Sequence, residues 1–148
     1  MVPVQALVNA VLKKSFTEDI QVTPMKLQKL LYFIYRDYLQ KQNHPLLSES
    51  FLAWDHGPVL SSVYYEFKTF SADPITRFFR DAAGNASIVS ESAVDIIASI
   101  DFVWSRFKHH TGPELSVFTH QPGTAWTTAR ASGNTTLLNE DILNEPNC

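Results

Sequence analysis

The sequence predicts a mainly α protein of the α+β class: a compact helical domain of about five to six helices with a small antiparallel β-hairpin. Three observations lead to this class. Apolar residues recur at helical spacing in several separate segments. Prolines and glycines interrupt the chain between those segments. Finally, 45% of the 148 residues are hydrophobic, and a chain of this length typically forms one domain with one core. We therefore expect a single domain over residues 1–148.

The first two helices are predicted from apolar stripes and from the residues that begin them. Residues 3–15 place valines and leucines on one helical face. Thr23 and Pro24 are residue types that favour an N-cap and the first helical position, so a helix is expected over 25–42. This second helix is apolar on more than one side, which is typical of a central helix that several neighbours touch.

The later elements are predicted from chain breakers and apolar runs. Residues 75–79 and 87–89 flank a turn-like segment at 81–85 and predict the hairpin. Further helices are expected from Gly57-Pro58 onward, over 91–109, from Gly112-Pro113 onward and over 124–131. The remaining residues, 132–148, carry little apolar periodicity and predict a flexible C-terminal segment.

Composition and charge exclude several classes of function. Twelve Lys and Arg against fifteen Asp and Glu give a net charge of −3, whereas a protein that binds the phosphate backbone of nucleic acid usually carries a basic surplus. The single cysteine, Cys148, can form no disulfide within the chain and supports no cysteine-based zinc site. No stretch approaches the roughly 18 apolar residues of a membrane span, and no leader pattern opens the chain. We expect a cytoplasmic protein.

The histidines suggest chemistry only weakly. His109 and His110 are helical neighbours that point about 100° apart, so they do not converge on one metal ion with His120. Asp55 and His56 resemble an acid–base pair, but no nucleophile motif accompanies them. We expect no metal and no cofactor. A small enzyme that uses Asp55, His56 or His120 is kept as the alternative from a different class.

Basic and aromatic side chains offer two further interpretations. Lys26 and Lys29 lie one helical turn apart beside Arg36, and we expect them on a solvated side of the second helix. Aromatic residues exceed what a small core readily absorbs, and Tyr35 and Tyr65 fall outside the apolar stripes. Because Tyr and Trp are favoured at protein interfaces, these residues favour a binding protein over an enzyme.

Three segments carry a resemblance to a known family. They are TPMKLQKLLYF at residues 23–33, FLAWDHGPV at 51–59 with Val63-Tyr64, and ELS at 114–116 with Thr119-His120 and Trp126. In this order, and over about residues 4–130, the chain resembles the Panacea, or SocA-like, antitoxin family. The resemblance implies a small, non-enzymatic bacterial or prophage protein of a toxin–antitoxin system, encoded beside the toxin that it neutralises.

The resemblance also implies a partner and a site. The expected partner is a cognate protein toxin encoded by an adjacent gene, with no nucleic acid and no membrane. Lys26 and Gln28 are polar motif positions without an obvious packing need, so we expect them in the interface. The other expected partner-binding residues are Tyr35, Trp54, His56, Tyr65 and Trp126.

Two alternatives concern other modes of binding. A founding member of the family delivers its toxin to a AAA+ protease, and here residues 139–148 would serve as the tether of such a proteolytic adaptor. A phage-encoded inhibitor of a host factor is the other alternative.

Overall fold

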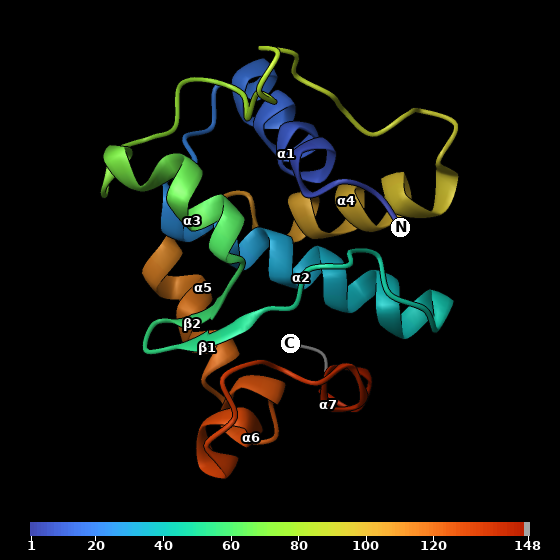
Figure 1. Cartoon of the computed structure of the whole chain (residues 1–148), viewed down its shortest axis with the longest axis vertical. Helices are drawn as coiled ribbons and strands as arrows, with labels where there is room; N and C mark the ends of the chain where they lie inside the picture. Colours follow the sequence, from blue (N-terminus) through green and yellow to red (C-terminus); the bar gives the residue numbers. More distant parts are fainter. Residues whose placement is uncertain (147–148) are drawn as a thin grey trace.

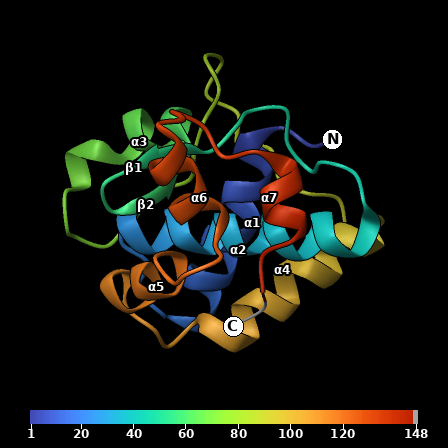
Figure 2. The same cartoon turned by 90° about the horizontal axis from the view of Figure 1, so that it is seen from below.

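The computed structural model describes residues 1–146, and helix α2 (Pro24–Gln42) runs through the middle of the molecule (Figures 1 and 2). The other elements, in chain order, are α1 (Val4–Glu18), β1 (Leu52–Trp54), β2 (Gly57–Val59), α3 (Ser61–Phe67), the short 3-10 helix η1 (Lys68–Phe70), α4 (Val94–Phe107), α5 (Gly112–Thr119), α6 (Ala125–Ser132) and α7 (Asn139–Leu143). Within the described residues there are seven α-helices and one two-stranded antiparallel sheet, which confirms the predicted class. None of these helices is both long and apolar enough to cross a bilayer.

Helix α2 begins and ends as its sequence predicts. The Thr23 side chain accepts a hydrogen bond from the Lys26 amide at 3.3 Å, and Pro24 takes the first helical position. Asn43 ends the helix in the left-handed conformation, with a φ of 58°. Helices α1, α3, α4, α5 and α7 and strand β2 all pack on α2. Because neighbours cover it on several sides, most of its residues are buried.

The structure corrects the expected solvated side of this helix. Lys26, Lys29 and Arg36 are only 5%, 1% and 6% exposed. Charged side chains are seldom buried unless they are paired. Their burial follows from the position of α2, because the elements packed around its start and middle leave these three positions no open face.

The β-hairpin forms at a different place from the one predicted. Strands β1 and β2 pair, with Trp54 opposite Gly57, whereas residues 75–79 and 87–89 form no strand. The Asn9 side chain of α1 explains the difference. It donates to the carbonyls of Phe79 at 2.9 Å and Ser87 at 2.7 Å, and it accepts from the Phe79 amide at 2.8 Å. One buried amide group thus takes the backbone bonds that a strand pair would have used.

Gly57-Pro58 does not begin a helix as predicted. Both residues lie in β2, and helix α3 starts at Ser61. The boundary is set by Gln28 of α2, which accepts from the Leu60 amide at 2.9 Å and donates to the Leu60 carbonyl at 3.0 Å. This paired contact holds the residue between strand and helix in an extended conformation, with a ψ of 119°.

The C-terminal segment, expected to be flexible, is packed against the rest of the protein as far as residue 146. Residues 135–137 run beside β1, where Thr136 bridges Leu52 and the Leu137 amide donates to the Phe51 carbonyl at 2.9 Å. Helix α7 then lies against α2, with Ile142 1% exposed. Residues 147–148, which include the single cysteine, lie outside the described residues.

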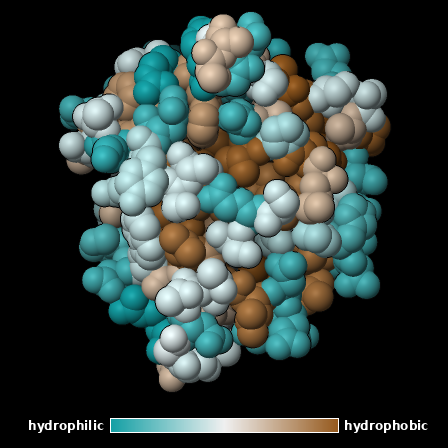
Figure 3. Space-filling model, in the orientation of Figure 1, coloured by the Kyte–Doolittle hydropathy of each residue, from teal (hydrophilic) through white to brown (hydrophobic). Residues whose placement is uncertain are grey.

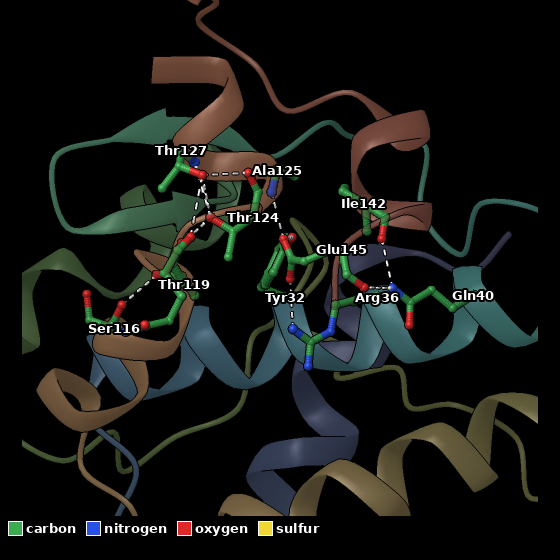
Figure 4. A network of polar contacts seen from close by, with 11 residues as sticks. Tyr32, Arg36, Gln40, Ser116, Thr119, Thr124, Ala125, Thr127, Ile142 and Glu145 are labelled. Carbon is green, nitrogen blue, oxygen red and sulfur yellow. Dashed lines mark hydrogen bonds and ion pairs between the residues drawn. The ribbon is translucent and has the colours of Figure 1, made fainter. Parts of the chain in front are cut away.

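Glu145 joins this segment to α2 and α6 (Figure 4). Its carboxylate accepts from the Tyr32 hydroxyl at 2.7 Å, the Arg36 guanidinium at 2.7 Å and the Ala125 amide at 2.8 Å. The Ala125 amide is at the start of α6, where the helix dipole favours a negative charge. Gln40 adds bonds to the carbonyls of Ile142 and Glu145. One buried carboxylate therefore joins the C-terminal segment to two helices, α2 and α6.

Replacing this carboxylate should destabilise the protein strongly. We expect Glu145→Ala to lower the free energy of unfolding by about 3–5 kcal/mol, because it removes the buried counter-charge of Arg36 and the acceptor of the Ala125 amide. Urea unfolding followed by circular dichroism measures the change. Glu140→Ala, at an exposed position of α7, should stay within about 0.5 kcal/mol of the unmodified protein. Equal stability of the two variants would contradict the role given to Glu145.

Candidate functional site

The hairpin of β1 and β2 is the centre of the candidate site. Its turn consists of Asp55 and His56, which are both exposed. Gly57 follows with a φ of +115°, a conformation that residues with a side chain rarely adopt. A Cβ atom at Gly57 would lie 2.8 Å from Thr119 Oγ1 and 3.0 Å from Lys29 Cε. A glycine is therefore needed both for the turn and for the close approach of these two side chains.

Side chains from α5 and α6 bond four consecutive carbonyls of the hairpin, those of residues 53–56. From α6, the Arg130 guanidinium donates to the carbonyl of residue 53 at 3.0 Å, and the Trp126 indole donates to that of residue 54 at 2.6 Å. From the end of α5, the His120 ring bonds the carbonyl of residue 55 at 3.1 Å, and the Ser116 hydroxyl donates to that of residue 56 at 2.6 Å. The hydroxyl of Thr124, the N-cap of α6, donates to the Thr119 carbonyl at the end of α5 at 2.8 Å, and the Thr119 hydroxyl donates to the Ser116 carbonyl within α5 at 2.7 Å (Figure 4). The turn is consequently fixed to the helical body although it protrudes into solvent.

The side chains that could have supported catalysis take part in these same contacts. The Asp55 carboxylate pairs with Arg130 at 2.9 Å, and the His120 ring bonds the Asp55 carbonyl and lies on Trp126, with ring centroids 3.8 Å apart. Thr119 Oγ1 lies 3.1 Å from His120 Nδ1, but Thr119 is 1% exposed and cannot meet a substrate as placed. No group of three His, Asp, Glu or Cys side chains converges as a metal site within residues 1–146.

Aromatic side chains lie next to the hairpin. The Trp54 ring meets Tyr64 edge to face at 4.8 Å, and Tyr64 meets Tyr65 at 5.3 Å. Tyr64 is 42% exposed and Tyr65 64% exposed, while Trp54 and Trp126 are half-buried. The hairpin face is defined here as Trp54, His56, Tyr64, Tyr65 and Trp126. It combines exposed aromatic rings with a backbone held in place.

A pocket of about 340 Å³ opens beside the hairpin face, between β1–β2, α3 and the start of α2. Met25, Val59 and Val63 supply apolar lining, and Trp54 and Tyr64 line it as well. Its other lining residues include Lys29, His56 and Lys68, and no Asp or Glu is among the described residues that line it.

Lys29 is the least expected residue of this pocket. Its side chain comes from α2 and is 1% exposed, and its Nζ donates to the Pro58 carbonyl at 3.2 Å. Burial lowers the pKa of Lys29 from 10.5 to about 8, because the charged ammonium loses its hydration. At about 1.4 kcal/mol per pH unit, a decrease of this size corresponds to a cost of roughly 3 kcal/mol for keeping the charge inside the folded protein.

The expected partner-binding residues fall into two groups. Trp54, His56, Tyr65 and Trp126 lie on the hairpin face, whereas Lys26, Gln28 and Tyr35 are buried at 5%, 5% and 3% exposure. As described above, Gln28 is bonded to the backbone of Leu60.

Lys26 and Tyr35 are likewise bonded within the protein. Lys26 donates to the Lys108 and Gln21 carbonyls, and burial lowers its pKa. Tyr35 donates to Asn139 at 2.8 Å, and burial raises the pKa of its hydroxyl. Of the three buried side chains, Gln28 lines the pocket beside Lys29, whereas Lys26 and Tyr35 lie outside that pocket.

Sequence reasoning missed Tyr64 and Lys29 as site residues. Tyr64 fits the apolar spacing of its helix together with Leu60 and Phe67, a pattern that is typical of a buried position. Lys29 was assigned to solvent because of its charge. The available signal for Lys29 was its position beside Leu30 and Leu31 in a helix apolar on several sides, where an open face for a lysine is scarce.

Comparison with known proteins defines the class. Residues 27–127 match the model of the family described as antitoxin SocA-like, Panacea domain. The chain is 29% identical to antitoxin SocA of Caulobacter vibrioides (strain NA1000 / CB15N) over 133 residues, which is 84% of this chain and 69% of that relative. No solved structure matches the chain. The protein belongs to the SocA-like Panacea antitoxin family.

A substitution at Gly57 tests the geometry of the turn. We expect Gly57→Ala to lower the free energy of unfolding by about 2–4 kcal/mol, because the new methyl group meets Thr119 and Lys29 in a strained backbone conformation. Gly84→Ala is the matched control, with a φ of +85° but nothing within 4 Å of its Cβ position, and should cost only about 1–2 kcal/mol. Thermal and urea unfolding of both variants measure the difference.

Lys29 should make stability depend on pH. The folded state loses the Lys29 proton above pH 8, whereas the unfolded state keeps it up to about 10.5, so the free energy of unfolding should rise between these values. We expect Lys29→Met to raise the free energy of unfolding by about 1–3 kcal/mol at pH 7. This difference from the unmodified protein should shrink as the pH approaches 10, because Lys29 is then neutral in the folded state. Urea unfolding at pH 7, 8, 9 and 10 tests this expectation.

Lys13→Met, at an exposed position of α1, is the control and should leave this pH dependence unchanged. A Lys29→Met variant with the pH profile of the unmodified protein would show that Lys29 carries no lowered pKa.

Proposed function

We propose that this protein is an antitoxin that neutralises a cognate protein toxin by direct binding, and that the hairpin face forms the centre of the interface. Membership of the SocA-like family supports the antitoxin role. The observation that carries the proposed surface is the exposure of Tyr64 and Tyr65 of α3 next to Trp54 of the hairpin. The hairpin carbonyls are themselves bonded by side chains of Ser116, His120, Trp126 and Arg130. A small enzyme receives less support, because the polar groups of Asp55 and His120 are engaged in holding the hairpin.

The physical properties of the hairpin face suit protein binding. Tyr and Trp supply large contact areas that lose little conformational entropy, and they are enriched among the residues that dominate binding energy. The hairpin is already held by Ser116, His120, Trp126 and Arg130, so little backbone order has to be gained on binding. Figure 3 shows hydrophobic residues at the surface in several separate areas among hydrophilic ones.

The size and charge of the protein are compatible with this role. A standard interface buries about 800 Å² per partner, roughly a tenth of the 7538 Å² surface of this protein. The net charge of −3 would favour encounter with a basic partner, as many toxins that act on nucleic acid are.

Co-expression tests the proposed function. The gene adjacent to this one is induced alone and together with the antitoxin, growth is followed, and a tag on the antitoxin recovers the complex. Growth arrest, rescue and co-purification in a fixed ratio are expected. Rescue accompanied by loss of the neighbouring protein, with its level restored in a protease-deficient strain, would instead indicate delivery to a AAA+ protease. An adjacent protein that is harmless and forms no complex would contradict the proposal.

Substitution of Tyr65, the more exposed of the two tyrosines, tests the proposed interface. We expect Tyr65→Ala to weaken toxin binding by at least tenfold without lowering the melting temperature, because Tyr65 is 64% exposed and contributes little to the core. Phe102→Ala is the matched control. Phe102 is 49% exposed on α4, which Figures 1 and 2 place on a different side of α2 from the hairpin. Calorimetric titration with purified toxin measures both, and a greater effect of Phe102→Ala would move the interface to α4.

A further inference from the structure

The pocket beside the hairpin face is lined by basic and apolar side chains. We infer that it is an anchor site for an acidic side chain of the protein partner, an Asp or Glu that follows a large apolar residue. This inference rests on the proposed function, because it supplies the chemical character of the partner's contact. Three observations support it, and each concerns a different property of the pocket.

The first observation is the sign of its charge. Although the whole chain has a net charge of −3, the basic side chains Lys29, His56 and Lys68 line the pocket, and no Asp or Glu is among its described lining residues. Lys68 also lies over the Tyr65 ring, with its Nζ 5.2 Å from the ring centroid, so a cation adjoins the hairpin face. A cationic pocket on an acidic protein favours an anionic group over a neutral or cationic one.

The second observation is the incomplete bonding of the Lys29 ammonium. Three N–H groups are available, and the acceptor shown within the described residues is the Pro58 carbonyl at 3.2 Å. A methionine or leucine would fill similar space without the cost of a buried charge. The backbone at residue 57 also makes room for this head group, because a Cβ there would lie 3.1 Å from Lys29 Nζ. A carboxylate bound in the pocket would supply the missing acceptor.

The third observation is the shape and polarity of the walls. Met25, Val59 and Val63, together with the Trp54 and Tyr64 rings, give the pocket a mainly apolar lining. Its volume of about 340 Å³ is at the small end of the range of ligand sites, roughly 300–1,000 Å³. That is room for one or two side chains rather than a large cofactor. An apolar residue followed by Asp or Glu matches both the walls and the cationic lining.

Short capped peptides test the site directly with the intact protein. The probe is acetyl-Phe-Glu-amide, and its neutral match is acetyl-Phe-Gln-amide. Binding is followed by NMR through the ε-CH₂ signal of Lys29 and the indole NH signal of Trp54. We expect the Glu peptide to bind with a dissociation constant on the order of 1 mM, as small ligands do, and at least tenfold more tightly than the Gln peptide. Binding should weaken above pH 8, where Lys29 loses its proton in the free protein.

Two substitutions and a control locate the effect. Lys29→Met should remove the preference for the Glu peptide, and Lys68→Met, a second and exposed pocket lysine, should reduce the preference independently. Lys13→Met, exposed on α1, should retain the full preference. Circular dichroism confirms that each variant is folded. Equal binding of both peptides, or an unchanged preference in Lys29→Met, would overturn the inference.

A further peptide and the toxin complex separate the remaining outcomes. If acetyl-Phe-Gln with a free carboxyl terminus binds while the Glu peptide does not, the site takes a chain end and the inferred side-chain anchor is wrong. A toxin that is neutralised and binds Lys29→Met with unchanged affinity would overturn the pocket's role and leave the antitoxin function intact. Preferential binding of the Glu peptide without any toxin complex would support the pocket and count against the proposed function.

Discussion

The burial of α2 on several sides is the constraint on which the rest of the structure depends. A helix without a free face along its first three turns must bond every polar side chain that it carries inside the protein. Gln28 therefore bonds the backbone at Leu60, Lys29 bonds the hairpin at Pro58, and Arg36 pairs with Glu145. These contacts place α3, the hairpin and the C-terminal segment relative to one helix. The candidate site is thus built from the polar positions of α2 and the elements they fix.

Some of this could be read from the sequence and some could not. The start of α2 was predictable because Thr23 and Pro24 act locally, and so was α5, whose Thr111 and Glu114 form a capping box. The sequence predicts the hairpin at the wrong place, over residues 75–89. There the backbone of Phe79 and Ser87 bonds the side chain of Asn9, which lies 70 positions before Phe79 in the sequence. Side-chain contacts over such distances leave no periodic trace in the sequence.

The same distinction applies to the site residues. Tyr35 and Tyr65 both fall outside the apolar stripes, yet Tyr65 is exposed whereas Tyr35 is buried and bonded to Asn139. Lys26 and Gln28 looked functional because no local packing need was visible, yet the contacts that use them come from residues 108 and 60. Glu145 lies in a segment with little apolar periodicity, and only the folded protein shows that Tyr32, Arg36 and the start of α6 meet there.

The side chains that hold the hairpin in place differ from those proposed to contact the partner. The segments that carry the family resemblance contain Gln28 and Gly57, which hold the hairpin and its neighbours in place. Exposed positions such as Tyr65 contribute little to the core and can change without unfolding the protein. In this protein Gln28 and Gly57 hold the hairpin in place, whereas under the proposed function the rings around the hairpin and the charge in the adjoining pocket would select the partner. Lys29 belongs to both groups, because it bonds the hairpin from the core and brings a positive charge to the pocket at a cost in stability.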